Sequence, residues 1–438
     1  MSVRPPESPR ASGTSVARAT ELPDAGRSFD AGRSFDAMWA ALEQVGRDAR
    51  TGGYRRFAWT REDAHLREWF AGECAARGLD VVEDRAGNQW AWWGDPDVVR
   101  ADGTSGGVAV GSHLDSVPDG GAFDGPLGVV SALAAIDGLR AAGLTPAVPV
   151  AVVSFVDEEG ARFGIACAGS RVITGALPAE RALGLRDGDG LTMAEALQAL
   201  GRDPAALGRD DETLRRVTTF VELHVEQGRA LADLGPATSA VAVGSDIWPH
   251  GRWRIDVPGT ANHAGTTRLE DRRDAMLGYA ETVLAAREVA TARGCVATMG
   301  KIRVEPNGVN AIASHVTGWL DARGADEAAV RAAVVDLGTF AQAHGATMIE
   351  ESWTGATFFA PDLVRRLAHT VGPSTPFLGT GAGHDAGILS AHGIPSAMLF
   401  VRNPTGVSHS PQEHAERADC HAGVVALTRV LADLTGAS

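Results

Sequence analysis

Four short apolar runs constrain the fold of this chain most, because each reads as a buried strand and each leads into side chains that can bind a metal. In an open α/β sheet the carboxyl ends of parallel strands meet at one edge, where ligands bind. Side chains far apart in the sequence therefore converge there, and the pattern indicates a two-metal hydrolase. The runs are residues 106–112 before His113, residues 149–156 before Glu158 and Glu159, residues 220–223 before His224, and residues 397–401 before the loop to His409.

The length of 438 residues predicts two domains, since single hydrophobic cores stop growing at about 250 to 300 residues. Helical spacing of apolar residues predicts helices over 35–46, 61–78, 128–142 and 191–201, with Thr60 as an N-terminal cap. Apolar strands alternate with these helices. We therefore predict an α/β catalytic domain, formed by residues 34–245 and 357–438, with a mixed, largely parallel sheet and helices on both faces.

The segment between these two parts has a different pattern of polar and apolar residues. Its alternating polar and apolar residues and its helical stretches predict the order β-α-β-β-α-β. Such a unit has a sheet covered on one face only, and it is inserted between His224 and the returning catalytic strands. We predict that residues 246–356 form an α+β lid and dimerisation domain. The predicted elements are a strand at 252–257, a helix at 271–293, strands at 296–304 and 314–322, a helix at 326–345 and a strand at 348–353.

The N-terminal segment is polar and repeats one hexapeptide, at residues 25–30 and again at 31–36. We predict a disordered tail over residues 1–33 and assign no function to the repeat. No basic head followed by an apolar stretch marks a secretory signal, so a cytoplasmic location is expected.

The composition excludes several classes of protein. A net charge of -15 argues against a nucleic-acid partner, because phosphate binding relies on clustered Lys and Arg. No apolar stretch approaches the roughly 20 residues of a membrane helix, so no membrane association is expected. Four widely spaced cysteines without a C-x-x-C pair favour reduced, buried thiols over a disulfide framework.

The residues around the strand ends carry complementary chemistry. His113 and Asp115 supply an imidazole with an orienting carboxylate. Asp124 lies in the glycine-dense loop 120–128, which lets the backbone pass close to an ion. Glu158 and Glu159 are adjacent, so one can bind a metal while the other acts as general base. Each feature alone is also compatible with a satisfied polar pair or a solvated acidic turn.

Seven ordered segments together are far more specific than any one of them. On these segments the chain resembles, over residues 35–430, the di-metal amidohydrolases related to aminoacylases and carboxypeptidases. Within that superfamily it resembles the branch of N-carbamoyl-L-amino acid hydrolases and allantoate amidohydrolases. The segments are Gly111–Pro118, Phe123–Gly128, Asp157–Gly164, Glu222–Gly228, Asn262–Thr267, Asn307–Asn310 and Gly381–Ala386.

The resemblance implies two divalent metal ions per subunit. One would be held by His113, Asp124 and His224, and the other by Asp124, Glu159 and His409, with Asp124 bridging. Mixed histidine and carboxylate ligands suit zinc, manganese, cobalt or nickel.

The resemblance also implies the catalytic roles. Glu158 would be the general base and Asp115 would orient His113. His263, from the lid of a partner subunit in a homodimer, would stabilise the developing oxyanion.

Four residues would contact the substrate by the same resemblance. Asn310 and Arg323, on the same lid, would bind its carboxylate, the arginine bidentately. Gln227 and Gly383 would contact it from the catalytic domain. A surface salt bridge is the alternative reading of Arg323.

The chain departs from the family pattern at two places. Gly324 follows Arg323 where the family commonly has a histidine, and residues 247–250 read Ile-Trp-Pro-His where other residues are usual. These departures concern substrate contacts, not the metal site. His250, His315 and His384 receive no assigned role. The family pattern places His384 and Asp385 near the site, but packing or loop structure is an equal reading.

The function implied is metal-dependent hydrolysis of the carbamoyl C–N bond of a small ureido acid, releasing ammonia and carbon dioxide. Allantoate hydrolysis in purine degradation is favoured, because residues 53–59 and 87–92 look like those of bacterial purine-degrading members. An N-carbamoyl-L-amino acid hydrolase or β-ureidopropionase is the close alternative. A non-catalytic dimer that binds a small acid is the alternative from another class.

Overall fold

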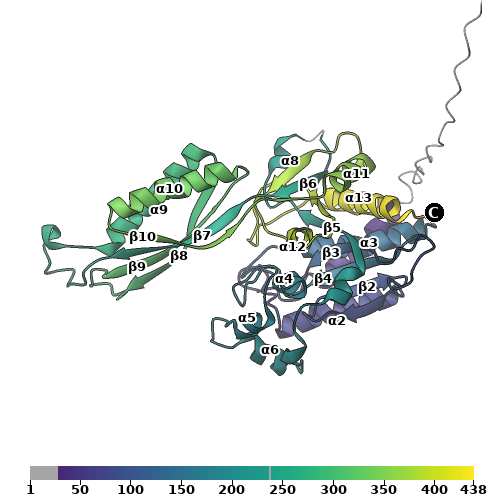
Figure 1. The fold of residues 1–438 in the computed structure, drawn as a ribbon, viewed down its shortest axis with the longest axis horizontal. Helices are drawn as coiled ribbons and strands as arrows, with labels where there is room; N and C mark the ends of the chain where they lie inside the picture. The colour runs from purple at the N-terminus through teal and green to yellow at the C-terminus, as the bar shows by residue number, and fades with distance from the viewer. Residues whose placement is uncertain (1–27, 236–237) are drawn as a thin grey trace, which may run out of the picture.

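The protein is described by a computed structural model over residues 28–235 and 238–438. Its strands form two sheets, one of nine strands and one of four, joined by a short neck (Figure 1). The predicted disordered tail lies outside the described residues up to residue 27. Helix α1 begins at Ser28, so the predicted boundary at residue 34 is wrong for residues 28–33, where the second copy of the repeat begins.

The larger sheet has the strand order β1-β2-β4-β3-β5-β13-β6-β11, with β12 paired to β6. Its central strands β4, β3, β5 and β13 are parallel, and its outer pairs are mainly antiparallel. The strands are β1 (Asp80–Glu83), β2 (Gln89–Trp93), β3 (Gly107–His113), β4 (Val150–Phe155), β5 (Val217–Val225), β6 (Val241–Ile247), β11 (Thr357–Phe358), β12 (Phe377–Thr380) and β13 (Ser396–Val401).

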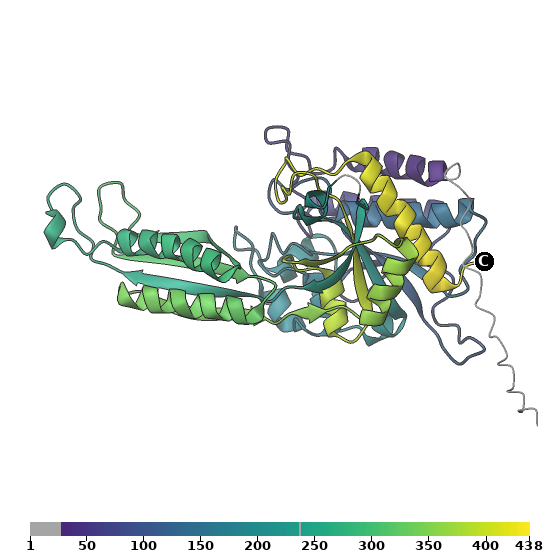
Figure 2. The ribbon, with the colours of Figure 1, turned by 90° about the horizontal axis from the view of Figure 1, so that it is seen from above.

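Helices lie on both faces of this sheet, as predicted (Figure 2). Helices α1, α3 and α13 pack against one another, and α12 packs against β5, β13 and α4. The helices are α1 (Ser28–Leu42), α2 (Arg61–Ala76), α3 (Pro126–Ala141), α4 (Ala168–Thr174), α5 (Ala179–Gly184), α6 (Met193–Ala199), α7 (Asp211–Arg215), α8 (Ala230–Asp233), α11 (Pro361–Val371), α12 (Asp385–Ala391) and α13 (Arg417–Thr435), with a 3₁₀ turn at Pro204–Ala206.

The core strands are buried throughout their length. Every residue of β3, β4 and β13 is buried, which explains why these strands read as unbroken apolar runs rather than as an alternating pattern. The Thr60 side chain accepts a hydrogen bond from the backbone of Asp63, so the predicted N-terminal cap of α2 is confirmed. All four cysteines are free.

The smaller sheet has the order β10-β7-β9-β8, with all pairs antiparallel. Helices α9 and α10 lie together on one of its faces (Figure 1), which leaves the other face uncovered. The chain order is the predicted β-α-β-β-α-β. The elements are β7 (His250–Pro258), α9 (Ala275–Arg293), β8 (Val296–Glu305), β9 (His315–Arg323), α10 (Glu327–Ala343) and β10 (Thr347–Thr354), with a 3₁₀ turn at Leu269–Asp271.

Each sheet has its own hydrophobic cluster. The cluster of the smaller unit includes Trp253, Ile255 and Val257, the three residues that the alternation on β7 places on one face. The chain crosses between the sheets at residues 248–249 and 355–356. We call the smaller unit, residues 248–356, the lid. In the described residues no helix combines the length and hydropathy that a bilayer crossing requires.

Candidate metal centre

Metal-ligand side chains converge at one edge of the larger sheet. His113 is the last residue of β3, and His224 is the second-to-last residue of β5. Glu159 lies in the turn after β4, and Asp124 lies in the loop that leads into α3. His409 lies in the loop after β13 with a φ of 54°. The two strand histidines are thus inside their strands rather than just past them, which fixes their backbones by sheet hydrogen bonds.

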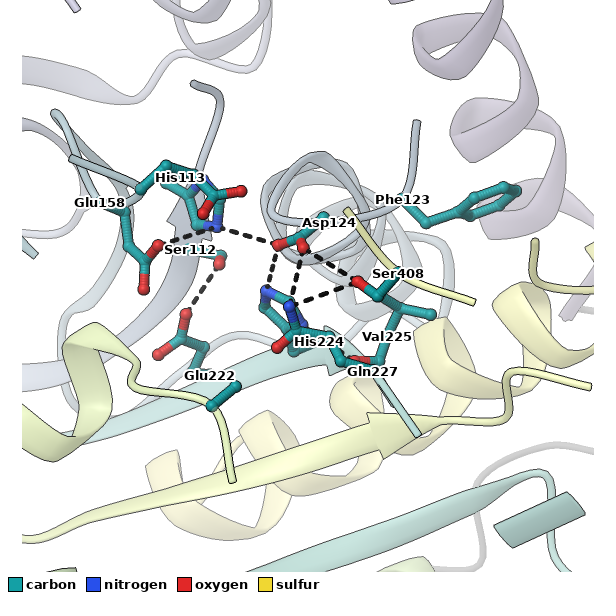
Figure 3. Close-up of polar contacts among 12 residues, drawn as sticks. Ser112, His113, Phe123, Asp124, Glu158, Glu222, His224, Val225, Gln227 and Ser408 are labelled. Atoms are coloured by element: carbon teal, nitrogen blue, oxygen red, sulfur yellow. Dashed lines mark hydrogen bonds and ion pairs between the residues drawn. The ribbon is translucent and has the colours of Figure 1, made fainter. Parts of the chain in front are cut away.

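The ligand atoms form two groups that share Asp124. His113, Asp124 and His224 make one group, and Asp124, Glu159 and His409 make the other, with the ligand atoms of each group within 4.8 Å of one another. The Oδ1 atom of Asp124 lies 3.5 Å from His113 Nε2 and 3.2 Å from His224 Nε2 (Figure 3). Its Oδ2 atom lies 3.3 Å from His409 Nε2. One carboxylate therefore faces both groups, which is the arrangement of a bridging ligand.

The unsatisfied atoms of this cluster fit a bound cation. His224 Nδ1 lies 2.9 Å from the Val225 carbonyl oxygen, and His113 Nδ1 lies 3.2 Å from that of Asp115. Each ring can therefore donate from Nδ1 and keep the Nε2 lone pair for a metal. Both Nε2 atoms, and Oε1 of Glu159, are buried without a hydrogen-bond partner in the described residues. Buried polar atoms are rarely left so, and two divalent cations would satisfy them.

The electrostatics of the cluster also call for positive charge. Among the described residues, the carboxylates of Asp124, Glu158 and Glu159 form ion pairs with histidines but with no lysine or arginine. Burial raises the pKa of Glu159 to about 7, and the Asp124 carboxylate adds to the rise. The hydrogen bond to Asp124 raises the pKa of His409 to about 9, although burial opposes it. Both shifts favour the protonated forms of these side chains, and a bound cation would displace those protons.

Asp115 organises the turn that carries the two glutamates. Its Oδ1 accepts a hydrogen bond from the backbone N–H of Glu158 and its Oδ2 accepts one from that of Glu159, both at 3.1 Å. Its Oδ1 also lies 3.4 Å from His113 Nδ1. Asp115 therefore orients the turn as well as the imidazole. The buried carboxylate of Glu158 reaches within 3.7 Å of His113 Nε2, beside the ligand cluster (Figure 3).

Gly125 explains why the loop around Asp124 is rich in glycine. Its φ is 85°, and a Cβ atom there would lie 2.4 Å from Cε1 of His113. Any side chain would displace the imidazole, so only glycine permits this approach.

Glu413 links the two loops that carry Asp124 and His409, and the sequence did not single it out. Its Oε2 accepts hydrogen bonds from the backbone N–H groups of Phe123 at 2.9 Å and Asp124 at 3.0 Å. Its Oε1 accepts one from the Ser408 hydroxyl at 2.8 Å. The only sequence signal is its place four residues after His409, which does not reveal a contact nearly three hundred residues away.

Two further residues lie near the site, and the sequence assigned neither of them a role. The buried ring of His384 lies 4.5 Å from that of His224, and burial holds the pKa of His384 well below its usual range. The buried thiol of Cys167 lies 3.4 Å from Oε1 of Glu158. The only sequence signal that His384 lies near the site is its place in the Gly-His-Asp motif.

Glu222, His224 and His384 form a third group of ligand-type atoms. The Glu222 carboxylate, however, already accepts hydrogen bonds from the Ser112 hydroxyl at 2.7 Å and from the Ala386 N–H at 3.0 Å. Both oxygens of Glu222 thus have partners, whereas both ring nitrogens of His384 are buried without one in the described residues.

A cavity of about 590 Å³ opens between this cluster and the base of the lid. Its lining includes Glu158 and three of the residues predicted to bind substrate, namely Gln227, Arg323 and Gly383. Gln227 Nε2 donates to Asp124 Oδ2 at 2.8 Å, so this amide contacts the bridging carboxylate directly.

His263 and Asn310 do not line that cavity. A β-bridge joins His263 to Ala311, so both residues lie beyond the distal ends of the lid strands. Arg323 ends β9, whose nine residues span roughly 26 Å from His315. Asn310 and Arg323 are therefore at opposite ends of one lid. The expectation that they bind one carboxylate from the same lid is wrong.

Comparison with known proteins gives a consistent picture. A family model described as Peptidase family M20/M25/M40 matches residues 94–433. An N-carbamoyl-L-amino acid amidohydrolase of Geobacillus stearothermophilus is 36% identical over 404 residues, which cover 89% of this chain and 96% of that protein. An allantoate amidohydrolase of Escherichia coli (strain K12) is 30% identical over 408 residues, which cover 90% and 95% of the two chains.

The solved structures agree with the sequence relatives. A hydantoinase/carbamoylase family amidase from Burkholderia vietnamiensis superposes with a TM-score of 0.80 at 30% identity, covering 94% of this chain and 99% of that one.

Proposed function

The chain belongs to peptidase family M20/M25/M40, and from that premise we propose that it hydrolyses the carbamoyl C–N bond of a small ureido acid. Relatives named for N-carbamoyl-L-amino acid and for allantoate hydrolysis support this class of reaction. It is a hydrolase of carbon–nitrogen bonds. The observation that carries the proposal is the carboxylate of Asp124 facing two groups of metal ligands, with Glu158 beside them.

The ligand set suits two divalent cations. His113 and His224 would hold one and Glu159 and His409 the other, with Asp124 shared by both. Such ions act as Lewis acids and lower the pKa of a water towards about 7. Zinc and manganese are the favoured candidates, since the donor set suits both.

The protein groups would then act in sequence. Glu158 takes a proton from the attacking water and returns it to the departing nitrogen. Asp115 keeps the Glu158 turn and His113 in position through its hydrogen bonds. Arg323, at the lid side of the cavity, binds the substrate carboxylate, and Gln227 and Gly383 contact the rest of the substrate.

The distal end of the lid supplies the remaining groups in a homodimer. His263 and Asn310 are exposed and lie away from the cavity of their own chain. In our proposal they reach the cavity of a partner subunit, where the imidazole stabilises the developing oxyanion. The uncovered face of the lid sheet and its edge strand β8 offer the surface for this association.

Allantoate is the favoured substrate, and N-carbamoyl-L-amino acids are the second candidate because the Geobacillus relative carries that activity in its name. The test is ammonia release from allantoate, N-carbamoyl-L-amino acids, N-carbamoyl-β-alanine and N-acetyl amino acids. The assay is run before chelation, after chelation, and after adding zinc or manganese back. We expect turnover of a ureido acid that chelation abolishes and metal restores. Turnover confined to N-acetyl compounds, or activity that survives complete metal removal, would contradict the proposal.

A further inference from the structure

Arg171 is a cation in the wall of the cavity that forms no ion pair in the described part of the chain. Its side chain lines the cavity, and its Nε donates to the Ala166 carbonyl oxygen at 3.0 Å. Within the described part of the chain, no carboxylate lies within ion-pair distance of its guanidinium. Its remaining guanidinium donors have no hydrogen-bond partner in the described residues, and such donors are well suited to a carbonyl or carboxylate oxygen.

The position of Arg171 relates it directly to the reaction centre. Cys167, just before α4, lies 3.4 Å from Glu158 Oε1, and it lines the same cavity. Arg171 is four residues further on the same helical face, roughly 6 Å along the axis. Thr174 continues this face and also lines the cavity. One wall of the cavity is thus formed by the helical face that begins beside the proposed base and includes Arg171.

A separate cationic position lies on the lid side of the cavity. Arg323 donates to both carboxylate oxygens of Asp321, at 2.7 and 2.6 Å, and to the Gly381 carbonyl oxygen at 2.6 Å. Arg252 also lines the cavity, and its Nε lies 3.6 Å from the same Asp321 carboxylate. Two guanidinium groups share one carboxylate, which leaves one positive charge for the substrate carboxylate. Arg171, on the other wall, is then free for a second group.

Resting on the proposed function, we propose that Arg171 is a specificity-determining residue that binds the second arm of the ureido acid. By second arm we mean the substituent other than the carboxylate and the ureido group that is hydrolysed. The preferred arm ends in a hydrogen-bond acceptor, either the carbonyl of a second ureido group or a carboxylate. An arm that is pure hydrocarbon would cover the guanidinium and leave its donors unpaired. A site built to hydrogen-bond a group rejects analogues that lack it far more strongly than an apolar pocket rejects a polar one.

The experiment measures kcat/KM for three substrates that share the reacting group. They are allantoate, N-carbamoyl-L-glutamate and N-carbamoyl-L-methionine, so the second arm ends in a ureido group, a carboxylate or a thioether chain. The variants are Arg171→Met and Arg171→Lys. Arg181→Met is the matched control, because Arg181 is exposed on α5 and does not line the cavity. Metal content and melting temperature check that each variant is folded and loaded.

We expect Arg171→Met to lower kcat/KM for the better acceptor-bearing substrate by roughly 10- to 100-fold, mainly through KM, as loss of a charged hydrogen bond predicts. Its effect on N-carbamoyl-L-methionine should be less than about threefold, since that arm offers no comparable acceptor. Arg171→Lys should recover part of the loss, and Arg181→Met should change nothing. The ratio of allantoate to N-carbamoyl-L-glutamate turnover identifies which acceptor is preferred.

Two outcomes would overturn the inference, and they are distinguishable. If Arg171→Met lowers turnover of all three substrates equally, or of none, the residue does not select the second arm while the proposed function stands. If the unmodified enzyme hydrolyses none of the three and none of the other ureido acids, the proposed function fails and the inference fails with it.

Discussion

The edge of the larger sheet and the far end of the lid differ in how they hold their functional side chains. His113 and His224 are completely buried, and each is fixed by a strand and by a hydrogen-bonded carbonyl group. His263 is exposed in a loop, and among the described residues its Nδ1 accepts only from the backbone N–H of Gly265. The sheet edge is preorganised within one chain, whereas His263 lies away from the cavity of its own chain.

The largest loss of activity is expected from a substitution at the edge of the larger sheet that carries the metal ligands. Replacing Glu158 with Gln keeps the shape of the side chain but removes the proton acceptor. We expect kcat to fall by about 10² to 10⁴-fold, which is the usual contribution of a general base. Metal content by elemental analysis should be unchanged. Glu180→Gln, on the exposed α5, is the control, and a Glu158→Gln variant with full activity would remove Glu158 from the mechanism.

The second prediction concerns whether the exposed far end of the lid contributes to catalysis. His263→Ala should lower kcat by about 10² to 10³-fold, as removal of an oxyanion donor does, while His65→Ala on α2 should have no effect.

Mixing the two inactive variants decides whether His263 acts between subunits. Unfolding and refolding His263→Ala with Glu158→Gln should restore about a quarter of the activity, because half of the dimers are mixed and each has one intact site. Mixtures that stay inactive would place His263 in the site of its own chain.

The third prediction returns to the buried edge and concerns the link between its loops. Glu413→Gln retains the size of the side chain but replaces one acceptor oxygen by a donor, which faces either the Ser408 hydroxyl or two backbone N–H groups. We expect metal affinity to fall by about 10- to 100-fold, as for other groups that orient ligands. Competition with a chelator measures it. Glu416→Gln, which is exposed, should match the unmodified protein.

The smallest expected effect is on the lid surface. Arg293 and Asp336 form an ion pair at 2.6 Å between α9 and α10, but both side chains are more than 40% exposed. Replacing either by Ala should cost about 0.2 to 1 kcal/mol, as exposed pairs do, whereas Leu320→Ala in the buried lid core should cost about 2 to 5 kcal/mol. Urea unfolding measures both. Equal losses in the free energy of unfolding would contradict this ranking of an exposed ion pair below a buried core residue.

Much of this architecture was predictable because its signals are local. The β-α-β-β-α-β order of the lid follows from hydrophobic periodicity, and the capping residue of α2 follows from Thr60 and Asp63 alone. The early start of α1 at Ser28 was missed because its residues are polar and repetitive, so they resemble a tail. Glu413 and Cys167 were missed for another reason. Glu413 acts through contacts nearly three hundred residues away, whereas Cys167 lies only nine residues from Glu158 but stands in no distinctive motif.

The sequence by itself determined the central strands of the larger sheet, the elements of the lid and the set of residues able to bind metals, because periodicity and side-chain chemistry are properties of short segments. Only the tertiary structure decided which atoms face one another. The tertiary structure places the Asp124 carboxylate beside both ligand groups and joins two loops through Glu413. It also places Arg171 in the wall of the cavity, where no ion pair forms within the described residues. It also separated Arg323 from Asn310 by the length of a strand. These are distances between segments, which depend on how the chain packs and not on the order of its residues.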